Sequence, residues 1–142
     1  MIDTTTTVNP SAHRTRIWQP GLIGAIAAAA VNLTLFAVSR AADTSFLVRR
    51  SSDADPTEVT ALHVLLTTVI PFIVGLAIAV AAERRLRQGL RTLQVVGAAI
   101  AVVSLAGPLS VEADITAKLV LATMHVITGG CFVVAVGRAR SA

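Results

Sequence analysis

Four long stretches of the chain are almost wholly apolar, and polar residues gather in the segments between them. Each stretch holds about 20 residues, the length that a helix needs to cross a bilayer at about 1.5 Å per residue. None alternates apolar and polar positions as a barrel strand does, and barrel strands are about half as long. Because a helix satisfies its own backbone in lipid, the pattern predicts four transmembrane helices. They cover residues 20–38, 59–82, 93–111 and 117–136.

The segments around these stretches predict how the helices are connected. Short connections favour an all-α, up-down-up-down bundle over residues 18–138, in which sequential helices are antiparallel neighbours. Residues 1–17 are polar and rich in threonine, so we expect a disordered tail there, and residues 139–142 form a second, short tail. Residues 39–58 form the longest connection, with a turn predicted at the sequence SSDADP. Thr57 is expected to cap the second helix.

The composition excludes an ordinary soluble domain. Of the 142 residues, 54% are hydrophobic and 14% are charged, and the mean hydropathy is +0.75, whereas soluble domains have about 25% charged residues. The net charge of +4 does not indicate nucleic-acid binding, because the basic residues stand in short runs rather than on one continuous face. The single cysteine, Cys131, cannot form a disulfide within the chain and is expected to be a buried structural thiol.

The distribution of charge predicts how the helices are oriented in the membrane. If the chain crosses four times, the two tails and the connection between the second and third helices share one side. That side carries eight basic and two acidic residues, whereas the other side carries four basic and six acidic residues. Since basic connections stay in the cytoplasm, we expect a multi-pass protein of the cell membrane with both termini cytoplasmic. The eight basic residues are Arg14, Arg16, Arg84, Arg85, Arg87, Arg91, Arg138 and Arg140.

The first apolar stretch has a second interpretation, as a secretory signal peptide. Arg14 and Arg16 would form its positively charged start, and Ser39-Arg40-Ala41 would form its cleavage site. The apolar run is long for such a signal, and an arginine just before the cleavage site is unfavourable. A retained helix is therefore the favoured interpretation, and cleavage stays open as the alternative.

Every predicted helix has one face on which small and polar residues recur at helical spacing. Since polar groups are costly in lipid, these faces hold the candidates for function. Small residues also allow neighbouring backbones to approach closely, which favours helix packing. The four faces consist of Gly24, Ala28 and Asn32; Thr60, His63 and Thr67; Gly97, Ala101, Ser104 and Pro108; and Lys118, Ala122, His125 and Gly129.

Four of these polar residues are predicted to share one layer of the bundle. Each lies two or three positions outward from the midpoint of its helix, and His63 lies further out. Pro71 and Pro108 are expected to kink their helices, because each leaves the carbonyl four residues earlier without its helical donor. Asp114 and Lys118 are placed at the outer mouth, where they are expected to pair at i, i+4. The four residues of the layer are Asn32, Thr67, Ser104 and His125.

Three interpretations of this layer stay open. Polar side chains commonly hold one membrane helix to the next, at about 0.6–2 kcal/mol per contact, and this packing role is the favoured interpretation. A ligand-filled or water-filled cavity would use His63 and His125 as its titratable groups. A metal site would need both histidines and an outer carboxylate, Glu112 or Asp114, and their spacing is not diagnostic. We expect no metal, cofactor or enzyme activity, because the chain has no phosphate-binding loop, nucleophile elbow or acidic pair within a helix.

Four motifs give the chain a resemblance to a known family. They are GLIGAIAAAAVNLTLFAVSRAA (21–42), TTVIPFIVG (67–75), SLAGPLS (104–110) and ADITAKLVLATMH (113–125). In this order they resemble a family of small bacterial four-span membrane proteins of unknown function, from Gly21 to Arg138. The resemblance implies a four-helix architecture and carries no catalytic assignment. It singles out for testing Asn32, Pro71, Gly107, Pro108, Asp114, Lys118 and His125.

Two functions from different classes follow from these patterns. The first is a non-enzymatic integral membrane protein that self-associates or serves as an accessory subunit of an envelope membrane complex. Its expected partners are the lipid bilayer and a second copy or a larger membrane protein, and no nucleic acid. The alternative is a small transporter or ligand-binding module with an outward-facing polar cavity at the layer, in which His125 is the central group.

Overall fold

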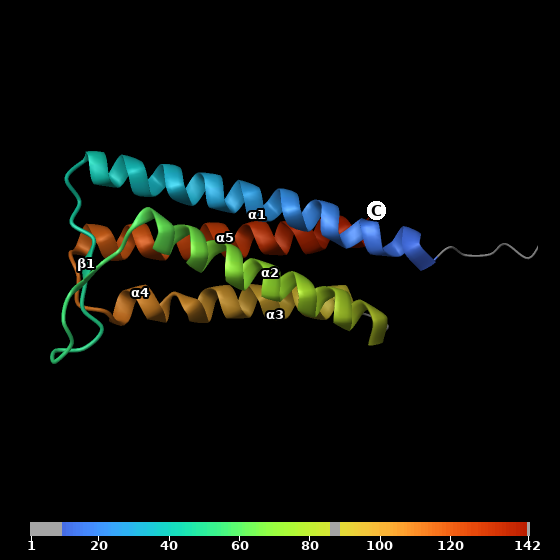
Figure 1. Ribbon diagram of the computed structural model, residues 1–142. Helices are drawn as coiled ribbons and strands as arrows, with labels where there is room; N and C mark the ends of the chain where they lie inside the picture. Colours follow the sequence, from blue (N-terminus) through green and yellow to red (C-terminus); the bar gives the residue numbers. More distant parts are fainter. Residues whose placement is uncertain (1–9, 86–88, 142) are drawn as a thin grey trace, which may run out of the picture.

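The computed structural model describes residues 10–85 and 89–141 and folds them into an all-α bundle (Figure 1). Four described helical stretches are long and apolar enough to cross a membrane, which confirms the predicted fold class. In Figure 1 the start of the first helix, the end of the second and the end of the last lie at one end, here called the terminal end. The helices are α1 (Pro10–Ala41), α2 (Ala61–Arg85), α3 (Gly89–Ser104) with its continuation α4 (Ala106–Ser110), and α5 (Ile115–Ser141).

The first and last helices are longer than predicted. Helix α1 begins at Pro10 rather than near residue 20, so residues 10–17 of the expected disordered tail have a helical backbone. Helix α5 continues to Ser141, through residues 139–141 of the second expected tail. Once a helix is nucleated and packed, each further residue adds a hydrogen bond at little cost, and proline is well tolerated in a first turn. Residues 1–9 and 142 lie outside the described residues.

The third span is broken one turn before its outer end. Proline has no N–H, so Pro108 cannot donate to the carbonyl of Ser104, its partner in a regular helix. At this point the N–H of Leu105 donates to the carbonyl of Val102, three residues back, at 3.2 Å. Helix α3 ends there and the short helix α4 follows. Pro71, by contrast, lies inside the uninterrupted helix α2.

Helix α1 ends in a left-handed turn at Asp43, whose φ is 60°. The N–H of Thr44 donates to the carbonyl of Ser39 at 3.0 Å, and the N–H of Asp43 donates to the carbonyl of Arg40 at 3.1 Å. These two bonds form a Schellman motif, in which glycine is usual at the left-handed position. Aspartate is one of the few other residues that tolerate this conformation, so the chain turns sharply away from α1.

The connection between α1 and α2 folds over the other end of the bundle. Strand β1 (Leu47–Val48) pairs antiparallel with β2 (Thr57–Glu58), and the predicted turn lies between them. The backbone of Arg49 then bonds in both directions with Glu112, before α5, at 2.9 Å each. We call residues 42–60 the cap, residues 111–114 the α4–α5 connection, and this end of the bundle the cap end. The prediction that Thr57 caps α2 is wrong, because Thr57 is part of β2.

Thr60 takes the role at the start of α2 that was predicted for Thr57. Its Oγ1 accepts a hydrogen bond from the backbone N–H of His63 at 3.3 Å, and its own N–H donates to His63 Nδ1 at 3.3 Å. This reciprocal pair has the arrangement of a capping box, with an imidazole in place of the usual Glu or Gln. The pair fixes the point at which the cap passes into the bundle.

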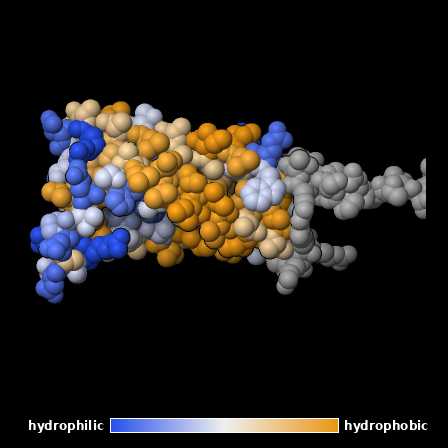
Figure 2. Space-filling view, in the orientation of Figure 1, coloured by the Kyte–Doolittle hydropathy of each residue, from blue (hydrophilic) through white to orange (hydrophobic). Residues whose placement is uncertain are grey.

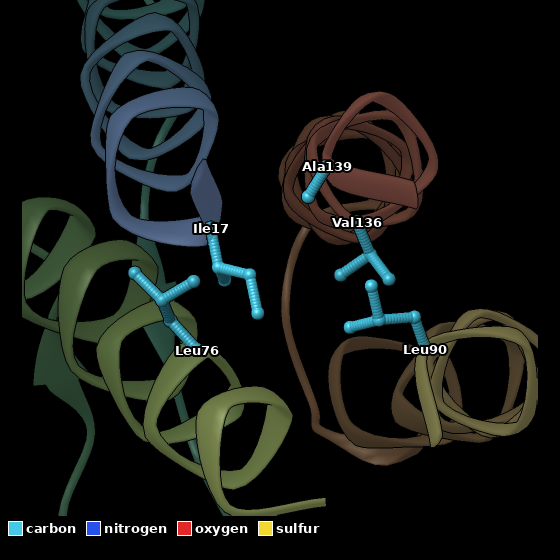
Figure 3. Packing of buried hydrophobic residues seen from close by; sticks show 5 residues of the cluster. All are labelled: Ile17, Leu76, Leu90, Val136 and Ala139. Carbon is cyan, nitrogen blue, oxygen red and sulfur yellow. The ribbon is translucent and has the colours of Figure 1, made fainter. Parts of the chain in front are cut away.

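All four spans meet at the terminal end. Figure 3 shows Leu90 of α3 facing Val136 of α5, and Leu76 of α2 pointing toward Ile17 of α1. Ala139 completes this terminal cluster. Within the bundle, α5 packs mainly against α1 and α3, and α2 packs against α1 and α3. The terminal cluster therefore needs every span to be in place.

Glycines allow close packing in the middle of the bundle. The ring of Phe132 on α5 lies between two of them: a Cβ added at Gly75 would lie 2.8 Å from this ring, and one at Gly97 would lie 2.9 Å from it. A Cβ at Gly129 would lie 2.3 Å from the Cβ of Ala101. Since real Cβ atoms do not approach so closely, α5 packs on α2 and α3 only because these positions lack a side chain.

The outer surface of the bundle suits a lipid environment. Figure 2 shows a broad apolar band between the polar cap end and the opposite end of the molecule. Large apolar side chains are exposed along every span, among them Ile26 on α1, Leu62 on α2, Val102 on α3 and Leu119 on α5. A soluble monomer rarely exposes more than a few hundred Å² of continuous apolar surface, so this band is the surface of a multi-pass membrane protein.

Candidate functional site

A buried side-chain amide joins three of the spans. Asn32 of α1 is 1% exposed, and its Nδ2 donates to Thr68 Oγ1 on α2 and to Thr128 Oγ1 on α5, at 3.0 Å each. The carbonyl oxygen of Met124 is a further, more distant acceptor at 3.4 Å. We call Asn32, Thr68 and Thr128 the amide layer. Both amide hydrogens are thus used, and they are used between helices.

The other half of the same amide has no partner. Asn32 Oδ1 is buried and accepts no hydrogen bond from any described residue. Thr128 donates its hydroxyl hydrogen to the carbonyl of Met124 at 2.8 Å, so it is not directed at this oxygen. A buried acceptor left unpaired costs about 1–3 kcal/mol, and lipid offers no water to compensate. The amide layer is therefore not optimised for stability alone.

Apolar layers enclose the amide layer on both sides, one helical turn away. Toward the cap end, Phe36, Val64 and Met124 each lie four residues from a member of the amide layer and belong to one buried cluster. Toward the terminal end, Ala28 and Phe72 belong to a second buried cluster. Four residues correspond to about 6 Å along a helix axis. The amide layer is therefore a thin polar zone inside an apolar core.

One member of the outer apolar cluster comes from the cap rather than from a span. Phe46 is 1% exposed although it lies in the connection before β1. Its ring centroid is 4.8 Å from that of Phe36, and it packs in the same cluster as Ala117 at the start of α5. Ala117 is fully buried, and its small side chain leaves room for the ring. Phe46 thus closes the cap end above the amide layer.

The predicted polar face of α2 points the other way. His63 and Thr67 are exposed on the outside of the bundle, and Thr67 Oγ1 donates to the carbonyl of His63 at 2.7 Å. Thr68, the next residue along, faces inward and joins the amide layer. Because a hydroxyl can bond to its own helix, Thr67 is satisfied at a lipid-facing position. Consecutive helix residues differ by about 100° in direction, so the inward face of α2 is the one that carries Thr68 and not the predicted one that carries Thr67.

Ser104 and His125 lie at half-buried positions and also bond within their own spans. Ser104 Oγ donates to the carbonyl of Ala101 at 2.8 Å. His125 Nδ1 lies 2.8 Å from the carbonyl oxygen of Leu121 and donates to it in the tautomer that carries its hydrogen on Nδ1. Of the predicted layer, Asn32 therefore takes part in the interhelical polar contact, whereas Thr67, Ser104 and His125 do not join it.

Asp114 and Lys118 are not paired at the outer mouth. Asp114 Oδ1 accepts the backbone N–H of Thr116 at 2.8 Å, which makes Asp114 the N-cap of α5. This hydrogen bond from Thr116 holds the pKa of Asp114 below its ordinary value. The ion pairs of the described residues join Arg40 to Glu58 and Arg49 to Glu112 instead. Asp114 therefore fixes the start of α5 rather than neutralising Lys118.

The small-residue faces of α1 and α3 are used inside the chain. Gly24 lies against Phe72 and Ala135, and Ala28 is fully buried. On α3, Gly97 and Ala101 face α5, and Pro108 is buried. These two predicted faces do pack inward, as expected, and the helices they contact belong to the same chain.

Three residues of the site were missed in the sequence: Thr68, Thr128 and Phe46. Thr68 shares a face with Val64, Phe72 and Leu76, so the run of large apolar residues at helical spacing was the available signal. Nothing in the periodicity of the chain predicts the burial of Phe46, because it lies in a connection. Among the described residues, no three His, Cys, Asp or Glu side chains are grouped as metal ligands would be.

Comparison with known proteins gives a family but no activity. Residues 12–142 match a family described as a family of unknown function, DUF6069. The chain belongs to the DUF6069 family. No curated protein and no solved structure matches this DUF6069 chain. The expected resemblance to an uncharacterised family is thus confirmed at that level, and the function must be inferred from the geometry of the DUF6069 bundle itself.

Proposed function

We propose that this DUF6069 protein is a non-enzymatic integral membrane protein that associates, through α3, with a second copy or with a larger membrane protein of the cell envelope. The support is the uneven coverage of the spans. In the most apolar stretch of each, 6% of the residues are buried for the α3–α4 span, against 28% for α1 and for α2 and 17% for α5. A span with so little cover inside its own chain has the most surface left for another helix.

The outward residues of α3 fit such a contact. Ala98 and Ala99 are exposed next to Val95 and Val102. Membrane helices associate through close packing, which small residues permit, because lipid provides no hydrophobic driving force between them. The inward small residues of α1 and α3 are already engaged, so the outward face of α3 is the favoured contact surface.

Cysteine crosslinking tests this proposal in native membranes. Cys131→Ser removes the native thiol, and Val102→Cys then places a thiol on the outward face of α3. Ile26→Cys, on α1, is the matched control, because both positions are 68% exposed. We expect oxidation to give a crosslinked product for Val102→Cys and not for Ile26→Cys. Equal crosslinking at both sites would argue against a contact through α3, and no crosslinking at either would argue against a second copy as the partner.

The placement in the membrane is part of the same proposal. The excess of basic residues on the side of the termini supports cytoplasmic termini and a cap on the outside. A reporter that is active only in the cytoplasm, fused after Ala142, is expected to be active, and the same reporter inserted at Ala54 in the cap is expected to be silent. The reverse pattern would overturn the orientation.

A second candidate function is a small transporter or ligand-binding module, and the unpartnered Asn32 Oδ1 favours it. In this role the amide takes the central place that the sequence suggested for His125. If Asn32 serves only to hold helices, Asn32→Leu should lower the free energy of unfolding by about 0.6–2 kcal/mol. If it is kept for a ligand, the cost of the unpaired acceptor is expected to offset the two donated bonds, so that the nearly isosteric leucine leaves stability unchanged or raises it.

Unfolding of the purified protein in detergent measures this difference. Thr34→Val is the control on the same helix, because Thr34 is exposed and its hydroxyl bonds only to the carbonyl of Ala30, at 2.8 Å. A destabilisation of Asn32→Leu well beyond that of Thr34→Val would support the packing role and remove the basis of the second candidate.

A further inference from the structure

The cap is held to the bundle by few and mostly exposed contacts. Two backbone hydrogen bonds join Arg49 to Glu112, and the ion pair of these residues is long, at 3.9 Å. The ion pair of Arg40 and Glu58 is shorter, at 2.7 Å, with both side chains about half exposed. Exposed pairs contribute little to stability. The strongest remaining attachment is the buried ring of Phe46, beside which the partly buried Val59 packs against the same cluster.

The ring of Phe46 packs in a cluster whose other buried members all come from the spans, and we call the position of the ring among them the socket. Phe36, Val64, Ala117 and Met124 belong to the same cluster and come from α1, α2 and α5. None of these four carries a charge. If the cap moved away, the helices would keep a socket of about the size of one aromatic ring, while the bundle beneath it stayed packed.

The amide layer lies directly below this socket. Phe36, Val64 and Met124 are each one turn, about 6 Å along the axis, from Asn32, Thr68 and Thr128 respectively. At that depth both amide hydrogens are already donated, and Asn32 Oδ1 has no donor among the described residues. A molecule that extends one turn below the position of the Phe46 ring would therefore find an acceptor that needs a donor, among otherwise apolar side chains.

We propose that the cap is a plug over a binding socket: Phe46 withdraws, and an uncharged, ring-sized apolar molecule with one O–H or N–H group takes its place and donates to Asn32 Oδ1. This inference rests on the second proposed function. A charged ligand is excluded by the lack of a counter-charge in the socket, since a buried charge needs one. A ligand without a donor would fill the socket but leave the amide oxygen unpaired.

The test uses two probes that differ by one hydroxyl group. Toluene has the shape of the Phe46 side chain, and 4-methylphenol adds a donor to it. Calorimetric titration of Phe46→Ala in lipid nanodiscs, with empty nanodiscs subtracted, is expected to show 4-methylphenol binding about tenfold tighter than toluene. Combining Phe46→Ala with Asn32→Leu should abolish this preference and keep the binding of toluene. Phe46→Leu serves as a smaller opening if the alanine variant does not fold.

A disulfide lock tests whether the plug moves when Phe46 is present. Arg49 and Glu112 exchange both backbone hydrogen bonds, and such a pair has Cα atoms about 5.5 Å apart, within the range that a disulfide bridges. In a Cys131→Ser background, Arg49→Cys with Glu112→Cys should bind 4-methylphenol when reduced and lose at least tenfold in affinity when oxidised.

The outcomes separate the two proposals. Suppose that Phe46→Ala binds 4-methylphenol more tightly than toluene, but the reduced lock variant binds neither probe. This result would overturn the moving plug and leave the ligand site in place. Equal affinity for the two probes, or a preference that survives Asn32→Leu, would overturn the assignment of Asn32 as the acceptor. Failure of both probes to bind Phe46→Ala and Phe46→Leu would overturn the socket, whereas the second proposed function is decided separately by the unfolding of Asn32→Leu.

Discussion

The two ends of the bundle are closed by different means. At the terminal end, Ile17, Leu76, Leu90 and Val136 bring one or more side chains from each of the four spans into one cluster (Figure 3). At the cap end, α3 and α4 contribute no buried member to the corresponding cluster among the described residues. The cluster instead includes Phe46, which comes from a connection. One end is thus closed by helices alone and the other by helices and a loop.

This difference has a consequence for local stability. The terminal cluster can open only if whole helices separate, which in a membrane protein means loss of the bundle. The cap is expected to detach more easily, because the contacts that hold it to the helices are a few backbone bonds, two exposed ion pairs and the side chains of Phe46 and Val59. Segments with few buried contacts open at lower free energy than the core. The cap end is therefore expected to be the dynamic end.

The largest effect is expected from removing the ring that closes the cap end. Phe46→Ala deletes a side chain that is 1% exposed and should lower the free energy of unfolding by about 3–5 kcal/mol. Leu47→Ala, at the next position and 52% exposed, is the control and should change little. Hydrogen exchange should increase in the cap and not at the terminal end; an increase spread evenly over both ends would remove the distinction between them.

The terminal end is tested by the equivalent truncation in its cluster. Leu76→Ala removes a side chain that is 3% exposed and contacts the other spans, and should cost about 2–5 kcal/mol. Because this cluster joins all four spans, the loss of stability is expected to affect the whole bundle. Hydrogen exchange should rise along the whole bundle. An increase in exchange confined to one pair of helices would contradict a cluster shared by all four spans.

A smaller effect is expected where α3 packs on α5, between the two ends. Gly129→Ala places a Cβ 2.3 Å from that of Ala101, and such overpacking should cost about 1–3 kcal/mol. Gly130→Ala, one position further, meets nothing within 4 Å and should be neutral or stabilising by up to about 1 kcal/mol, since alanine favours helix. Thermal unfolding in detergent distinguishes the variants, and equal behaviour would show that α3 does not approach α5 so closely.

The smallest effect concerns acid and the start of α5. Because hydrogen bonding holds the pKa of Asp114 below its ordinary value of 3.8, its contribution to stability is present above that pH. It is lost as the pH falls below 3.8 toward the lowered pKa, because protonation weakens the acceptor. Asp114→Asn keeps a good N-cap and should remove this acid sensitivity. An unchanged pH profile of unfolding in the variant would contradict the assigned role.

Hydropathy and small-residue spacing predicted the spans and part of their packing. Gly24 and Ala28 on α1, and Gly97 and Ala101 on α3, face inward, because small side chains let a neighbouring helix or its aromatic ring approach closely. The face of α2 was predicted wrongly because polarity was taken to mean burial. Thr67 satisfies its hydroxyl on its own backbone, so lipid is no barrier to it, and the periodic apolar residues beside Thr68 were the better guide.

The rest of the candidate site depends on information that helical spacing does not contain. Phe46 reaches the core because the left-handed turn at Asp43 redirects the chain and because Arg49 pairs with Glu112, more than 60 residues later. Such long-range pairing depends on the tertiary structure. The free amide oxygen of Asn32 likewise follows from the positions of two hydroxyl groups on other helices, which the composition of one helix does not determine.

Helix α1 is continuous from the terminal end of the bundle to the buried amide layer. Pro10 and Asn32 belong to one helix, and 22 residues span about 33 Å at about 1.5 Å per residue. Between them, Ile17 of the same helix packs into the terminal cluster. A shift of α1 along its axis would therefore disturb the terminal cluster and change the distances from the Asn32 amide to its two hydroxyl acceptors together.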